Sequence, residues 1–216
     1  MSSRPAADPG ARERLLQAGL ALARERGLKA LTVRAVAAEA GANLGSFVHH
    51  FGTRDAFVAE LIERWYAPMF GQLQDLARRP GDPLPALREA LLEFVAWVAR
   101  HRDFLALLLA DAAAGEPAVR RFVATIEQRH PAVLLGLIAQ AQDAGRLRRA
   151  EPLHQLMFLL ASLALPVLVT RLMSGREIAP PGFVSRLTPL AVAPERIAER
   201  LDWALRGLAP DPEPRR

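Results

Sequence analysis

Apolar residues recur along this chain at helical spacing, three or four positions apart, nearly from end to end. No segment of useful length alternates apolar and polar residues in the way that a half-buried strand does. The 216 residues, 51% of them hydrophobic, are enough to bury a core. The pattern therefore predicts an all-α protein.

Capping and breaking residues predict where the helices begin and end. Asp8 and Pro9 suit the start of a first helix that runs to Arg26, and Thr53 suits a cap for the fourth. Pro68 is expected to kink or end the fourth helix, and the proline-rich stretch 175–193 to be a loop. The other predicted helices span 32–40, 44–51, 83–101, 102–112, 117–130, 131–144, 152–173 and 194–208.

Composition excludes several classes of protein. The chain has no cysteine, which excludes disulfide scaffolds, cysteine zinc sites and thiol catalysis. The first ten residues hold no apolar stretch, so we expect no signal peptide and a cytoplasmic location. The net charge of +5 is compatible with a nucleic-acid partner but does not by itself establish one.

The run from Leu156 to Val169 is apolar except for Ser162. It is shorter than the roughly 20 residues that a membrane span needs, so we expect a helix buried between the core and a second subunit, and no membrane. The last helix carries a narrower apolar stripe that suits packing beside it. The residues expected at this homodimer interface are Leu160, Leu168, Ile197, Leu201 and Leu205.

The segment 32–57 has the spacing of two helices joined by a sharp turn. Ala37 is small where the helices would cross, and Gly41 tolerates the positive φ of a tight turn. Phe47 and Phe51 supply a packing face, while the rest of the second helix is mostly short or polar. Such a surface is what a recognition helix needs in the major groove of DNA.

The spacing of these residues resembles the helix-turn-helix of the TetR family of transcriptional regulators. The residues that carry the resemblance are Thr32, Ala37, Gly41, Gly45, Ser46, His49, Phe51, Thr53, Arg54 and Asp55. The resemblance implies an N-terminal three-helix DNA-binding domain over 8–70, with the helix-turn-helix at about 32–52. It also implies a C-terminal helical domain over 83–208 that binds a small molecule and dimerises. Residues 1–7 and 209–216 are expected to be disordered.

The same resemblance implies which residues contact double-stranded DNA. Phosphate contacts are expected from Thr32, Val33, Arg34, His49, His50 and Arg54, and base-edge contacts from Asn43, Gly45 and Ser46. The family often has a lysine at the position of Leu44 and aromatic residues at those of Val48 and His50. Leu44 and Val48 cannot donate hydrogen bonds, but apolar side chains suit the methyl group of thymine.

Aromatic and polar residues of the second half are candidates for an effector site. At helical spacing they are core residues first, although helical bundles also hold ligands between their helices. The candidates are Phe94, Trp97, Phe104, Phe122, Thr125, Gln128, Met157 and Phe158. Because few of them are polar, we expect a largely apolar effector.

The sequence therefore predicts a homodimeric, ligand-responsive regulator of transcription, a repressor that binds a near-palindromic operator. Two alternatives stay open: a helical enzyme that uses the C-terminal cavity, and a small-molecule-binding adaptor without DNA binding. The chain shows no catalytic constellation and no phosphate-binding glycine loop, so we expect no enzyme activity and no cofactor. No metal is expected either, since adjacent helical residues such as His49 and His50 point about 100° apart.

Overall fold

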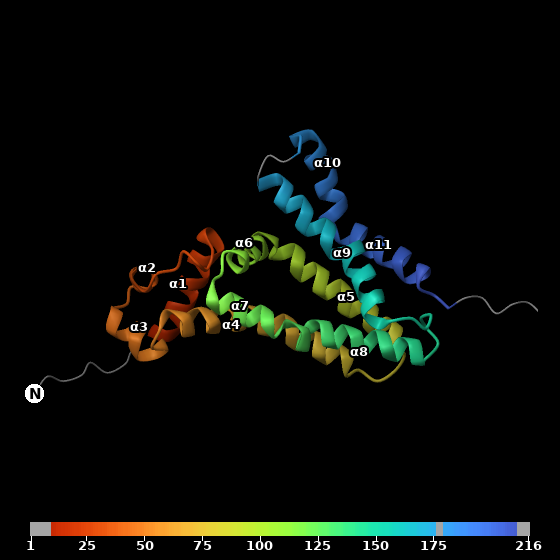
Figure 1. Ribbon diagram of the computed structural model, residues 1–216, viewed down its shortest axis with the longest axis horizontal. Coiled ribbons are helices and arrows are strands. Elements are labelled where there is room, and N and C mark those ends of the chain that lie inside the picture. Colours follow the sequence, from red (N-terminus) through yellow and green to blue (C-terminus); the bar gives the residue numbers. More distant parts are fainter. Residues whose placement is uncertain (1–9, 176–178, 211–216) are drawn as a thin grey trace, which may run out of the picture. The chain divides into compact units, whose positions relative to one another are not determined.

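The computed structural model describes residues 10–175 and 179–210, and within these ranges it contains helices and no strand. The predicted all-α fold is therefore confirmed. The α-helices are α1 Ala11–Arg26, α2 Val33–Glu39, α3 Leu44–Phe51, α4 Arg54–Ala77, α5 Pro83–Arg100, α6 Arg102–Ala113, α7 Pro117–Ala124, α8 His130–Asp143, α9 Pro152–Gly175, α10 Pro181–Val192 and α11 Pro194–Gly207 (Figure 1), with a short 3₁₀ helix, η1, at Ile126–Gln128.

The chain divides into two compact units. Unit 1 comprises Met1–Ala67 and Asp103–Ala124, and unit 2 comprises Pro68–Arg102 and Thr125–Arg216. This division differs from the expected one because α6 and α7 group with the N-terminal helices. The chain therefore leaves unit 2 after α5, forms α6 and α7 as part of unit 1, and returns to unit 2 before α8.

The interior of unit 1 is built around aromatic side chains of α4. Trp65 packs edge-on against Phe104 of α6, with 4.7 Å between the ring centroids. Tyr66 packs in the same way against Phe122 of α7, at 5.1 Å. These four side chains are buried, so they join α6 and α7 to the first half of α4.

Unit 2 is a bundle in which α9 packs against α5, α8, α10 and α11. Figure 1 shows α10 turned back beside the C-terminal end of α9. Its interior is almost entirely aliphatic, and its fully buried side chains include Leu87, Leu91, Leu134, Leu137, Ile138, Leu159, Leu163 and Leu201. Two buried glutamines fasten the loop between α8 and α9: Gln142 donates to Ala150 O at 2.8 Å, and Gln155 donates to Arg148 O at 2.9 Å.

Two helical predictions need correction, and one of the two alternatives given for Pro68 is excluded. Helix α4 continues through Pro68 to Ala77, so the proline does not end it. Within the expected proline-rich loop the chain forms α10, because Pro181 occupies the first helical turn, where a missing N–H leaves no bond unmade. Residues 117–130 form the shorter α7 followed by η1.

The expectations for the two ends fall largely outside the described residues. The cap at Asp8, the start at Pro9 and the disorder of 1–7 and 211–216 lie there. Ala209 does lie within the described part, and its carbonyl accepts a 3.3 Å hydrogen bond from Nε of Arg148.

Helix α9 agrees closely with the predicted helix 152–173, and it is longer than the apolar run 156–169 that lies within it. From Pro152 to Ser174 it is long and apolar enough, with a mean hydropathy of 2.1, to cross a membrane by length and composition. It nevertheless packs against four other helices of unit 2. Only 33% of its most apolar stretch is buried, which leaves one apolar face uncovered.

The ring of His130, at the start of α8, stacks on Phe94 of α5 with 4.6 Å between centroids. Burial lowers the pKa of His130 to about 4, and the charge of Arg129 adds to the effect. The folded chain therefore keeps His130 neutral at a pH where the unfolded chain protonates it.

We therefore expect the free energy of unfolding to fall as the pH drops from about 6.5 to about 4, because the unfolded state binds the extra proton. In His130→Phe, which keeps the stacked ring and cannot titrate, this loss should be smaller by on the order of 1–3 kcal/mol. Urea unfolding of both proteins at pH 7 and pH 4 measures the difference. An equal loss in both would refute the assignment.

Candidate nucleic-acid interface

Helices α2 and α3 are each started by a side-chain cap. Thr32 Oγ1 accepts a 3.1 Å bond from Ala35 N, and Asn43 Oδ1 accepts a 2.7 Å bond from Ser46 N. Both cap residues are exposed, and each keeps a donor, a hydroxyl hydrogen in Thr32 and an amide NH₂ in Asn43. One side chain can therefore hold its own helix and donate to an external acceptor.

The turn between the two helices has the form expected for Gly41. Its φ is +60°, and the Ala42 N–H donates to Ala37 O at 2.9 Å while the Gly41 N–H donates to Ala38 O at 3.2 Å. This pair of bonds closes the end of α2 in a Schellman motif. The chain can then reverse within three residues and start α3.

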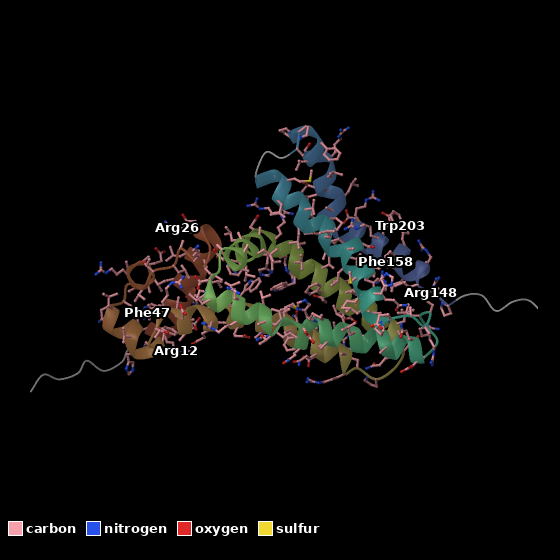
Figure 2. The ribbon with its side chains drawn as sticks, viewed as in Figure 1. Arg12, Arg26, Phe47, Arg148, Phe158 and Trp203 are labelled. Atoms are coloured by element: carbon pink, nitrogen blue, oxygen red, sulfur yellow. The ribbon has the colours of Figure 1, made fainter. Side chains whose placement is uncertain are left out.

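An aromatic cluster fixes α3 from behind. Phe47 and Phe51 of α3 both contact Phe57 of α4, with ring centroids 5.0 and 4.8 Å away. All three rings are buried, and Figure 2 labels Phe47 within this group of helices. The guanidinium of Arg12 lies 5.6 Å from the centre of the Phe51 ring. One face of α3 is therefore rigidly held, and the opposite face is left open.

The open face of α3 carries the residues predicted to read bases. Leu44 and Val48 are large apolar side chains that lie in solvent, Val48 with 57% of its surface exposed. Asn43, Gly45 and His49 are also exposed, and Ser46 is half-buried. On α2, Arg34 is exposed and Val33 is half-buried. The structure thus brings these predicted residues together on two adjoining helices of unit 1.

His50 needs a correction. Its Nε2 atom is buried and has no hydrogen-bond partner, and its ring packs against Phe51 with 6.2 Å between centroids. A buried nitrogen cannot reach a phosphate, so this atom is not a phosphate ligand.

Arg54 needs a larger correction, because its guanidinium is committed inside unit 1. Nε donates to Leu31 O at 2.6 Å, and Nη2 donates to Leu28 O at 2.7 Å. Two further bonds, of 3.0 and 3.1 Å, join it to the carboxylate of Glu116. We therefore assign Arg54 an internal role in place of the expected phosphate contact.

The sequence did not identify the residues at the end of α6 and just after it that bind Arg54 and the loop between α1 and α2. Glu116 binds Arg54, and Asp111 accepts from the backbone N–H of Leu28 at 2.6 Å. The one available signal was Asp111 itself, a carboxylate near the end of a helix whose other residues from Phe104 onward are all apolar. A buried charge at such a position needs a partner.

The predicted effector residues belong to both units of the chain. Phe104 and Phe122 are buried in unit 1, whereas Phe94 and Trp97 are buried in unit 2. Thr125 and Gln128 are exposed, as are Met157 and Phe158 on α9 (Figure 2 labels Phe158). A cavity of about 470 Å³ lies elsewhere, lined by the end of α9 and by α10, and it opens to solvent. No group of three or more potential metal ligands occurs among the described residues.

Two of the residues predicted at the dimer interface are not available for contact with a second subunit. Ile197 and Leu201 of α11 are buried within their own chain, Leu201 completely. Leu160, Leu168 and Leu205 keep part of their surface exposed. The narrow stripe of α11 therefore packs inside unit 2, and it is α9 that presents the wider uncovered apolar face.

The cap at Asn43 yields a prediction about stability. Asn43→Ala should lower the free energy of unfolding by about 1 kcal/mol, because the Ser46 N–H loses its acceptor. Asn43→Ser should keep most of that stability, since serine also caps helices well. Thermal unfolding followed by circular dichroism compares the two, and equal losses would show that the cap is not the cause.

Comparison with known proteins identifies the segment that contains this surface. Residues 15–61 match the sequence model described as bacterial regulatory proteins, tetR family. The chain is 33% identical over 112 residues to the HTH-type transcriptional repressor KstR2 of Mycolicibacterium smegmatis, covering 50% of this chain and 53% of that protein. It is 36% identical over 83 residues to KstR2 of Rhodococcus jostii, covering 38% and 40%. The matches thus span about half, or less, of the length of these relatives.

Solved structures extend the likeness of fold over almost the whole chain. The ketosteroid transcriptional regulator KstR2 of Mycobacterium tuberculosis superposes with a TM-score of 0.64 at 22% identity, covering 95% of this chain and 99% of that one. A complex of SmeT with triclosan gives 0.69 at 22% identity, covering 96% and 99%. Residues 15–61 thus match the tetR family model, and the chain as a whole shares the fold of these solved regulators.

Proposed function

We propose that this protein is a DNA-binding transcriptional repressor whose N-terminal helices contact the operator. The observation that carries the proposal is the open face of α3, held from behind by the three phenylalanines and flanked by the capped start of α2. The match of residues 15–61 to the tetR family model and the sequence similarity to two repressors add support. A soluble, cytoplasmic, non-enzymatic protein is consistent with this role.

In the proposed contact, α3 enters the major groove and α2 lies at the phosphate backbone. Arg34, the Thr32 hydroxyl and Val33 would meet phosphates, with His49 at the far end of α3. Asn43, Gly45 and Ser46 would lie nearest the base edges. Leu44 and Val48, both exposed and apolar, would contact thymine methyl groups, so we propose an operator in which thymine is preferred at those positions.

Release by a largely apolar small molecule is the second part of the proposal. The buried polar side chains of unit 2 already use their hydrogen bonds internally: Gln142 and Gln155 bind the loop after α8, and Thr170 donates to Pro166 O at 2.9 Å. The interior thus offers few groups that would hold a charged ligand. The effector would act by favouring a conformation that binds the operator poorly.

A homodimer is the third part, with α9 at its centre. A stripe of apolar side chains at spacings of four and three residues is exposed along α9, namely Leu153, Met157, Ala161, Leu165, Val169 and Leu172. Trp203 of α11, a helix that packs against α9, is exposed as well (Figure 2). A second copy related by a two-fold axis would cover this stripe with the same stripe. The two recognition helices could then meet half-sites about 34–36 Å apart.

Two substitutions separate phosphate contact from base readout. Arg34→Ala should weaken binding to all DNA sequences similarly and reduce the salt slope by about 0.9 for each phosphate that Arg34 neutralises. Val48→Ser should instead change the preferred sequence, because it removes an apolar contact with a base. Selection from random DNA, followed by titration at several salt concentrations, distinguishes them. If wild-type binding did not depend on salt, the proposed contact would be wrong.

Sedimentation tests the dimer. Leu165→Glu should convert a micromolar dimer into a folded monomer and abolish operator binding, since the charge lies on the exposed stripe of α9 and not on the helices of the proposed DNA surface. Leu109→Glu, on an exposed apolar residue of α6, is the control and should remain dimeric. Leu201 is unsuitable for this test because it is fully buried, so a charge there would disrupt the fold. A wild-type protein that is monomeric at micromolar concentration would exclude this assembly.

A further inference from the structure

The corner between α6 and α7 carries two buried carboxylates that lie outside the proposed DNA surface. Asp111 is 9% exposed and Glu116 is 4% exposed, and carboxylates so buried are rare without partners. Their partners are the α1–α2 loop and Arg54 at the start of α4. We propose that Asp111, Glu116 and Arg54, called here the clasp, are positioning residues for DNA binding. This inference rests on the proposed function.

Asp111 holds the first half of the loop. Its Oδ2 accepts from Leu28 N at 2.6 Å and from Lys29 N at 3.2 Å. The preceding Gly27 has a φ of +84°, and a Cβ atom there would lie 2.9 Å from the same oxygen. The loop therefore approaches the carboxylate as closely as a glycine allows. Lys29 adds a 3.3 Å bond from its ammonium to Ala114 O.

Glu116 and Arg54 hold the second half. The two carboxylate oxygens of Glu116 accept hydrogen bonds from Nη1 and Nη2 of Arg54, at 3.0 and 3.1 Å. This is a bidentate, end-on pair with well-defined geometry. The same guanidinium donates to the carbonyls of Leu28 and Leu31. Arg54 therefore fixes the two ends of the 28–31 stretch against one buried carboxylate.

This stretch decides where α2 begins. Leu31 immediately precedes Thr32, whose hydroxyl caps α2 and whose carbonyl accepts from Val36 N at 3.0 Å. Helix α2 spans seven residues, too few to be stable without tertiary support. The position of the Thr32 hydroxyl and of Arg34 thus depends on the loop, and the loop depends on the clasp.

The test compares operator binding by clasp variants at several salt concentrations. Asp111→Ala removes the acceptor for two backbone N–H groups, and Glu116→Gln removes the charge that binds Arg54. Both should bind the operator roughly tenfold more weakly, with a smaller salt slope and an unchanged preferred sequence, because phosphate contacts carry no base information. Asp111→Asn keeps an acceptor oxygen and should recover most of the affinity.

Two controls separate positioning from general destabilisation. Glu89→Gln makes the same chemical change in an exposed ion pair of unit 2, in which Nη1 of Arg79 lies 2.8 Å from Oε2 of Glu89. This variant should bind the operator as the wild type does. Leu137→Ala removes a buried side chain from the core of unit 2 and should lower the free energy of unfolding. Under conditions in which this variant is folded, it should bind the operator as the wild type does. The inference is overturned if folded Asp111→Ala and Glu116→Gln keep wild-type affinity and slope, or if Leu137→Ala weakens binding equally. Should Asp111→Ala fail to fold, Glu116→Gln and Asp111→Asn supply the comparison.

Amide hydrogen exchange tests the clasp independently of DNA. In the clasp variants the amides of Ala35 and Val36, in the first turns of α2, should exchange faster than in the wild type, while Phe47 in α3 should not change. Unchanged exchange at Ala35 and Val36 would overturn the positioning role. If the wild type bound no DNA at all, the proposed function would fail, and the exchange measurement would still decide whether the clasp positions α2.

Discussion

Two helices of seven and eight residues carry the proposed DNA surface, and helices of that length do not persist by themselves in water. Helix α3 depends on burial of Phe47 and Phe51 against Phe57 of the next helix. This cluster sets the orientation of α3, and therefore which residues remain on its open face. The side chains on the open face of α3 can therefore vary without disturbing the phenylalanine cluster, because none of them belongs to it.

The sequence is informative wherever structure is determined within a few residues. The Gly41 turn, the cap at Thr53 and the boundaries of α3 are all predicted from it, and the structure confirms them. Each depends on contacts three to five positions apart. Asn43 shows the limit of such reasoning: the sequence points to a base contact there, but not to the capping bond with Ser46.

Contacts between distant segments could not be predicted in the same way. Arg54 and Glu116 are 62 positions apart, and nothing local distinguishes a guanidinium that binds phosphate from one that binds a buried carboxylate. The apolar pattern of α9 is equally ambiguous, since a helix that is apolar on all sides does not reveal which side its own chain covers. The stripe of α11 is regular enough to identify as a packing face, yet its partner is its own subunit, as the complete burial of Leu201 shows.

The uncovered face of α9 connects this ambiguity with the proposed function. Met157 and Leu165 expose 62% and 52% of their surface, and burying such a side chain contributes about 1.5–3 kcal/mol. Several of them on one helix face would favour association strongly, and an isologous interface uses each of them twice. A single α3 reads only one half-site. The same helix that completes the core of unit 2 would therefore also supply the symmetry that a near-palindromic operator requires.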